Sequence, residues 1–262
     1  MSVRVPVPDR TRVLERREHP VVRVLALAGL LVLWELVTRT GRVPSLFLPS
    51  PLDVIQSGVE MLRSGELVTH VLTSLRRVVL GVGLGALGGV SVGLAIGISR
   101  LAEAVGNPLI AATFPIPKIA LPLLILWLGI GEASKVAVIT LGVFFPMAIN
   151  TYTGVRSADP LLIRAAVSFG AGRWSLIRKV LLPSALPMIF AGLKLGAGTS
   201  LLLLVAAEMI AANAGIGFLV LHAQNLMETT KLMVGIVLLS VLGVLTHWLL
   251  VRCERAAIPW TT

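Results

Sequence analysis

The chain has 262 residues, of which 56% are hydrophobic and only 14% are charged, and its formal net charge is +10. Because soluble domains carry about 25% charged residues, this composition excludes an ordinary soluble protein and predicts an all-α membrane protein whose apolar helices face lipid. The basic excess does not indicate nucleic-acid binding, since the basic residues interrupt apolar runs, and the single cysteine excludes an intrachain disulfide and a cysteine-based metal cluster.

Six segments of the chain are long and apolar enough to cross a bilayer, which takes about 20 residues of helix. They comprise residues 21–38, 78–98, 107–131, 136–155, 185–212 and 232–251. The third segment carries four prolines and Lys118, which predicts a broken or kinked crossing. We therefore expect a single membrane domain over residues 21–262, preceded by a mobile basic cytoplasmic tail at residues 1–20.

The distribution of Lys and Arg predicts the orientation of these spans. With the N-terminus in the cytoplasm, most Lys and Arg residues of the tail and loops fall on the cytoplasmic side, so both termini are expected there. Arg76 and Arg77 lie on the opposite side, at the start of the second span, and we interpret them as snorkelling to lipid headgroups. Between the first two spans, Ser50 and Pro51 predict the start of a short helix that lies on the bilayer.

The second span contains glycines at strict four-residue spacing, which are Gly81, Gly85, Gly89, Gly93 and Gly97. Four residues are about one helical turn, so these glycines line one face of the helix. A face without side chains lets the backbone of a neighbouring helix approach closely. The spacing therefore predicts a helix-packing surface.

The longest loop on the predicted cytoplasmic side, residues 156–184, contains the pattern of a short helix from Asp159 to Phe169. Asp159 is a suitable N-cap, Pro160 fits the first helical position, and Gly170 can take the left-handed conformation that ends a helix. Apolar residues form a stripe at helical spacing, made of Leu162, Ala165, Ala166 and Phe169. Such a helix suits either docking in a groove of a cytoplasmic protein or resting on lipid headgroups, and the pattern leaves both open.

This loop resembles the EAA loop of ATP-binding-cassette (ABC) importer permeases. The family pattern reads Glu-Ala-Ala, three residues, Gly, nine residues, Ile, one residue and Leu-Pro. At the same spacing this chain has Arg164-Ala165-Ala166, Gly170, Val180 and Leu182-Pro183, so that Arg164 replaces the family glutamate. Further segments resemble the permeases of nitrate, taurine and aliphatic-sulfonate importers; these are Pro49-Ser50-Pro51, Trp127–Glu132, Phe144-Phe145-Pro146, Ala207–Ile210 and Gly215-Ile216-Gly217.

The resemblance implies a type I ABC importer permease of MetI-like fold in the bacterial inner membrane, with six transmembrane helices and a cytoplasmic coupling helix. It implies two permease copies, expected as a homodimer, on two cytoplasmic ATPase subunits, with a small anionic solute such as a sulfonate, taurine or nitrate delivered by an extracytoplasmic binding protein. ATP and Mg belong to the ATPase, so this chain is expected to hold no cofactor and no catalytic residue. The residues implied in ATPase coupling are Asp159, Leu162, Arg164, Ala165, Ala166, Phe169, Gly170 and Pro183.

Three ionisable residues inside the predicted spans are candidates for the translocation pathway: Lys118, Lys194 and Glu208. A charge inside the bilayer is costly, so it indicates a wet cavity or a charged partner. The lysines suit an anionic solute, but structural ion pairs with Glu35 or Glu208 are the alternative. No His, Asp and Glu cluster has metal-ligand spacing, so no metal site is expected. An ATP-independent secondary carrier or channel for a small anion is the alternative function.

Overall fold

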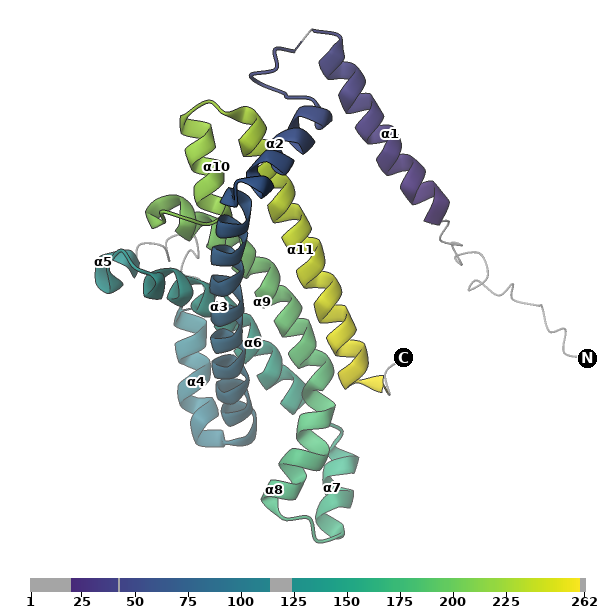
Figure 1. The fold of residues 1–262 in the computed structure, drawn as a ribbon. Coiled ribbons are helices and arrows are strands. Elements are labelled where there is room, and N and C mark those ends of the chain that lie inside the picture. The colour runs from purple at the N-terminus through teal and green to yellow at the C-terminus, as the bar shows by residue number, and fades with distance from the viewer. Residues whose placement is uncertain (1–19, 42, 114–123, 260–262) are drawn as a thin grey trace, which may run out of the picture. The chain divides into compact units, whose positions relative to one another are not determined.

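The computed structural model describes residues 20–41, 43–113 and 124–259. All regular secondary structure in these ranges is helical (Figure 1). The chain forms two compact units, residues 1–53 and residues 54–262. The expectation of an all-α fold is therefore confirmed for the described part of the chain.

The first unit contains α1 (Pro20–Arg39) and the start of α2 (Pro51–Arg63). Between these helices, the indole nitrogen of Trp34 donates a hydrogen bond to the carbonyl oxygen of Pro49 at 3.2 Å. Ser50 caps α2, since its hydroxyl accepts from the amide of Asp53 at 3.1 Å and donates to the Asp53 carboxylate at 2.8 Å. The helix predicted after Ser50 is thus confirmed.

The second unit is a bundle of long helices joined by shorter ones. After α2, the helices in chain order are α3 (Glu66–Ile98), α4 (Arg100–Thr113), α5 (Ile125–Leu128), α6 (Glu132–Arg156), α7 (Pro160–Ser168), α8 (Arg173–Leu176), a π-helical segment (Ile177–Leu181), α9 (Leu182–Ala211), α10 (Ile216–Asn225) and α11 (Thr229–Ala257). α6 packs extensively against both α3 and α9, while α10 and α11 pack against each other and against α9 (Figure 1). α6 is therefore the central helix of this unit.

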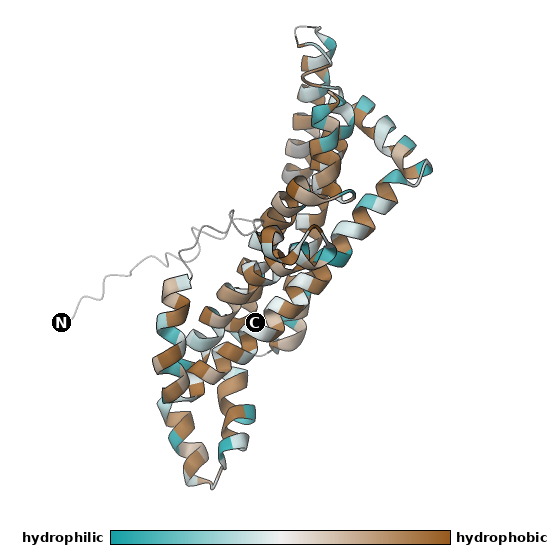
Figure 2. Ribbon diagram, turned by 90° about the vertical axis from the view of Figure 1, so that its left-hand side faces the viewer, coloured by the Kyte–Doolittle hydropathy of each residue, from teal (hydrophilic) through white to brown (hydrophobic). Residues whose placement is uncertain are grey.

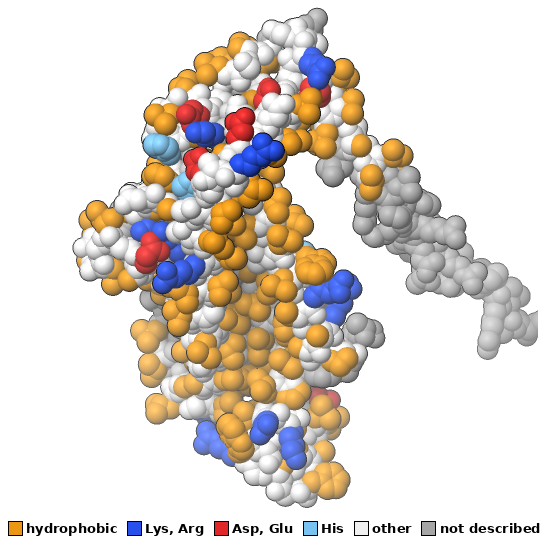
Figure 3. All heavy atoms as spheres, viewed as in Figure 1, with side chains coloured by type: hydrophobic (Ala, Val, Ile, Leu, Met, Phe, Trp, Pro, Cys, Tyr) orange, Lys and Arg blue, Asp and Glu red, His pale blue; other side chains and the backbone are white. Residues whose placement is uncertain are grey.

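Four helical stretches among the described residues are long and apolar enough to cross a membrane: Glu66–Ile98, Glu132–Arg156, Arg173–Ala211 and Thr229–Ala257. Hydrophobic residues extend along these helices in Figure 2, and Figure 3 shows a broad area of hydrophobic side chains between groups of charged ones. These four stretches overlap the segments predicted as spans at residues 78–98, 136–155, 185–212 and 232–251. The spans at residues 21–38 and 107–131 stay predictions, since α1 is not among these helices and residues 114–123 lie outside the described part.

α3 begins at Glu66, well before the predicted start of the second span at residue 78. The prediction placed Arg76 and Arg77 at the membrane surface. Arg76 is indeed exposed, but the side chain of Arg77 is buried among charged side chains of other helices. Snorkelling is therefore wrong for Arg77, because carboxylates inside the protein neutralise its charge.

The regularly spaced glycines of α3 lie against α6. A Cβ atom added to Gly85 would lie 2.6 Å from the carbonyl oxygen of Thr140, and one added to Gly93 would lie 2.6 Å from that of Ala148. The other three glycines of the set, Gly81, Gly89 and Gly97, face Ile139, Met147 and Val155. Because a side chain at these positions would meet backbone or branched carbon atoms of α6, the two helices approach as closely as they do only with glycine there.

Candidate functional site

The loop after α6 carries the short helix α7, whose two ends are set by local chemistry. The Asp159 carboxylate accepts a hydrogen bond from the amide of Leu161 at 2.8 Å, which makes Asp159 the N-cap, and Pro160 follows it. Gly170 has a φ of 77°, a left-handed conformation that favours glycine and ends the helix. The predicted helix is therefore confirmed, and it lies at one end of the second unit (Figure 1).

α7 and its C-terminal cap expose apolar side chains. The exposed fractions are 69% for Leu161, 54% for Leu162 and 92% for Phe169. Within the predicted stripe, Ala165 is exposed as well, and only Ala166 is partly covered. Adjacent exposed apolar side chains of this size are typical of a surface that binds a partner or a membrane.

Two further residues of α7, Arg164 and Ile163, lie outside the apolar stripe. Arg164, which replaces the glutamate of the family pattern, is exposed and forms no ion pair with any described residue. Its guanidinium is therefore free to meet an acidic group of a partner. Ile163 lies outside the predicted stripe and packs inward, against the apolar core that includes Val155 and Leu181. The inward contact fixes α7 to the bundle while the stripe stays outside.

After α7 the chain enters one continuous helical stretch, Arg173–Ala211, in which a π-helical segment joins α8 to α9. Pro183, the last residue of the family pattern, lies at the start of α9. A proline lacks an amide hydrogen, and its ring clashes with the carbonyl group four residues earlier, here that of Lys179. The wider π-helical turn at Ile177–Leu181 accommodates this change. Sequence reasoning missed this segment, because residues 156–184 were interpreted as a loop and Pro183 lies just before the predicted span at residues 185–212.

A cluster of charged side chains joins α3, α6 and α9 at the end of the bundle away from α7. The Nε and Nη2 atoms of Arg77 donate to the two carboxylate oxygens of Glu132 at 2.8 and 2.5 Å, and its Nη1 atom donates to Glu208 at 2.8 Å. Arg77 is 2% exposed and Glu208 is fully buried, whereas the Glu132 side chain is 57% exposed. Because Glu132 begins α6 and Glu208 lies near the end of α9, Arg77 ties its own helix to both.

The same cluster fixes the loop between α9 and α10. The Glu208 carboxylate accepts hydrogen bonds from the Ser74 hydroxyl at 2.7 Å and from the amide of Gly217 at 2.8 Å. Gly215 has a φ of 130° and passes so close to this carboxylate that a Cβ atom would overlap it. The segments Ala207–Ile210 and Gly215-Ile216-Gly217, which resemble the permeases of nitrate, taurine and aliphatic-sulfonate importers, therefore meet in one buried site. We call this site the Arg77–Glu208 cluster.

The three residues predicted for the translocation pathway differ in what the structure shows of their surroundings. Glu208 is fully buried, and its hydrogen bonds within the Arg77–Glu208 cluster favour a structural role over contact with a solute. Lys194 donates to Glu254 of α11 at 2.5 Å, so the predicted partners, Glu35 and Glu208, are wrong. Glu254 was missed because α11 continues past the predicted end of the last span. Lys118 lies outside the described residues, and its place in a pathway stays a prediction.

Comparisons with known proteins give a family and a fold. Residues 78–258 match the family described as the binding-protein-dependent transport system inner membrane component. The chain is similar to the taurine transport system permease protein TauC of Escherichia coli (strain K12), with 37% identity over 240 residues that cover 89% of this chain and 87% of TauC. It is 35% identical over 238 residues, 90% of this chain and 86% of the relative, to the putative aliphatic sulfonates transport permease protein SsuC of Bacillus subtilis (strain 168).

A solved structure of the MetNI methionine ABC transporter, in an inward-facing conformation, matches this chain with a TM-score of 0.59. The match covers 71% of this chain and 93% of that one, at 22% sequence identity. At this level of identity the match concerns the fold alone. The fold over the matched part of this chain is thus similar to that of the matched chain of the MetNI transporter.

Proposed function

This chain belongs to the family of binding-protein-dependent transport system inner membrane components, and it is the permease subunit of an ABC importer. We propose that α7 is the helix through which a separate ATPase drives transport by this permease. The exposed apolar residues of α7 carry this proposal. They lie on a helix that follows the end of an apolar span, where a groove on a cytoplasmic partner can cover them. The family assignment also argues against an ATP-independent carrier, because the relatives are ABC transport permeases.

Leu162→Asp is expected to reduce the ATPase that copurifies with the permease by about tenfold or more, because an unpaired carboxylate in an apolar groove removes binding energy at the centre of the contact. The measurement is affinity purification of the tagged permease followed by quantification of the ATPase. Val167→Asp is the matched control, since Val167 is 56% exposed on the other side of the same helix. Wild-type retention of the ATPase by the Leu162→Asp variant would contradict the coupling role.

We propose that the solute is a small sulfonate, because the names of both relatives refer to taurine or aliphatic sulfonates. ATP and Mg bind to the ATPase in this proposal, and the permease supplies the path. Vesicles that contain the importer and its binding protein are expected to take up labelled taurine or a short alkanesulfonate only when ATP is supplied on the ATPase side. Methionine is the control solute. Failure to transport any sulfonate while another solute is accumulated would overturn this assignment.

We further propose that residues 21–262 act as one membrane domain with both termini in the cytoplasm, and that two copies form a homodimer. Cys253, the only cysteine of the chain, tests the orientation, because it is exposed near the end of α11. A membrane-impermeant maleimide is expected to label it in inside-out vesicles and not in intact spheroplasts, and Cys253→Ser is expected to abolish the signal. Labelling in intact spheroplasts would reverse the proposed orientation.

A further inference from the structure

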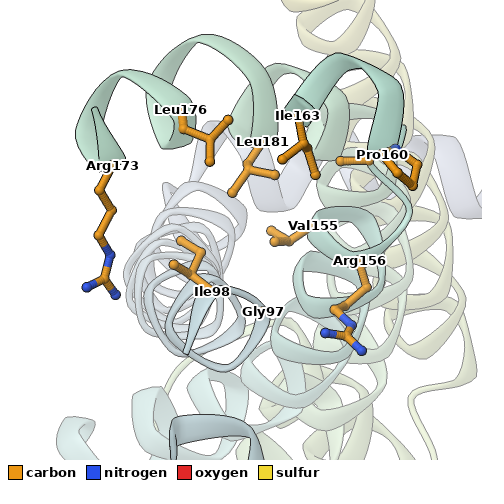
Figure 4. Close-up of a pocket in the computed structure, with 10 residues that line it drawn as sticks. Gly97, Ile98, Val155, Arg156, Pro160, Ile163, Arg173, Leu176 and Leu181 are labelled. Atoms are coloured by element: carbon orange, nitrogen blue, oxygen red, sulfur yellow. The ribbon is translucent and has the colours of Figure 1, made fainter. Parts of the chain in front are cut away.

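A cavity of about 480 Å³ lies where α3, α6, α7 and α8 meet (Figure 4). Its volume falls within the range of about 300–1,000 Å³ that is typical of ligand sites. Most of its wall is apolar and includes Ile98, Val155, Ile163 and Leu176, whose side chains converge on the space in Figure 4. The cavity can therefore accept an apolar group such as a lipid acyl chain.

Two arginines line the same cavity. Figure 4 shows the side chains of Arg156 and Arg173 on either side of the end of α3. The Arg156 side chain is 58% exposed, and its ion pair with Glu103 is long, at 3.7 Å. Arg173 is exposed and forms no ion pair with a described residue. The edge of the cavity thus has an excess of positive charge that is available to an anion.

The position of the cavity along the helices indicates where this anion comes from. Ile98 is the last residue of α3, and Arg156 is the last residue of α6. Both helices are apolar enough to span a membrane, so their shared end marks the level at which hydrocarbon gives way to headgroups. Basic cavities between transmembrane helices at this level are suited to anionic lipid headgroups.

We propose that this cavity, the α3–α6 end cavity, is a binding site for one anionic phospholipid of the adjoining leaflet. The guanidinium groups of Arg156 and Arg173 at the edge of the cavity attract the lipid phosphate, and an acyl chain lies along the apolar wall that includes Ile98 and Leu176. Charge complementarity selects an anionic lipid over a zwitterionic one. The inference requires that the chain is embedded in a membrane, but it does not depend on the coupling role of α7.

Native mass spectrometry of the assembled importer tests this inference. The complex is released from bilayers of phosphatidylethanolamine and phosphatidylglycerol, and the phospholipids that stay bound are counted. The wild-type complex is expected to retain phosphatidylglycerol, with an apparent affinity about tenfold or more above that of the Arg156→Gln/Arg173→Gln double variant. Arg178→Gln/Lys179→Gln is the matched control, because it removes two exposed charges from the same loop without touching the cavity. The control is expected to retain the lipid like the wild type.

A second measurement uses Trp174, which is 71% exposed and follows Arg173 directly. Brominated phosphatidylglycerol is expected to quench its fluorescence more than brominated phosphatidylethanolamine does, and the Arg156→Gln/Arg173→Gln variant is expected to lose this difference. Trp174→Phe identifies the contribution of the remaining tryptophans.

Three results would overturn the inference. The first is equal retention of phosphatidylglycerol by the wild type and the Arg156→Gln/Arg173→Gln variant. The second is displacement of the lipid by inorganic phosphate, which would make the free anion the ligand. The third is retention by the isolated permease but not by the assembled importer, which would assign the cavity to the ATPase interface.

Discussion

Arg77→Met is expected to lower the free energy of unfolding by about 3–5 kcal/mol, the largest effect expected for removing one charge among the described residues. The substitution leaves the fully buried Glu208 without its cation and breaks the ion pair to Glu132. Thermal unfolding of the purified permease in detergent measures the change. Arg76→Met is the matched control, because Arg76 is adjacent and exposed, and its loss is expected to leave the midpoint within a few degrees of the wild type.

The double variant Arg77→Met/Glu208→Gln separates a lost ion pair from a damaged helix. If the penalty comes from an unpaired buried carboxylate, removing that charge as well restores part of the stability. Equal unfolding temperatures for the wild type and the Arg77→Met variant would mean that the Arg77–Glu208 cluster contributes nothing to stability. A double variant no more stable than Arg77→Met would mean that the arginine acts through packing alone.

Gly89→Leu is expected to prevent the close packing of α3 on α6. A Cβ atom at this position would overlap Met147 and would lie 2.7 Å from the carbonyl oxygen of Phe144. Because the Cβ atom would overlap backbone as well as a side chain, the helices have to separate. We expect the free energy of unfolding to fall by an amount at or above the usual range for overpacking, about 1–3 kcal/mol. Size-exclusion chromatography of the solubilised protein is expected to show aggregated or absent material.

Gly83→Leu is the control for this experiment. Gly83 lies on the same helix, but a Cβ atom added there meets no atom within 4 Å. The control variant is expected to elute and unfold like the wild type. A monodisperse, equally stable Gly89→Leu variant would show that the α3–α6 contact in the structure is wrong.

Features that depend on neighbouring residues could be predicted from the sequence. The ends of α7 follow from a capping carboxylate at Asp159 and a glycine at position 170, both within one short segment. The glycine spacing on α3 likewise predicts that a helix packs there, since periodicity defines one face. The spacing does not identify α6 as that helix, because a glycine face can pack closely against many different helices.

Features that depend on distant residues could not be predicted. Arg77 bonds to Glu132 and Glu208, which are 55 and 131 positions away. A hydropathy argument treats each charge alone and therefore places it at a membrane surface, whereas the folded chain pairs it with opposite charges on other helices. The same reason applies to Lys194, whose partner Glu254 lies 60 positions away.

The unbroken helical stretch Arg173–Ala211 also connects α7 mechanically to the opposite end of the bundle. Its 39 residues form a rod about 58 Å long. The prolines at positions 183 and 187 weaken the rod near α7, so bending concentrates there, while the remainder stays stiff as far as Glu208. The Arg77–Glu208 cluster ties the opposite end of this stretch to α3 and α6, so a displacement applied near α7 is carried along the helix to those two helices.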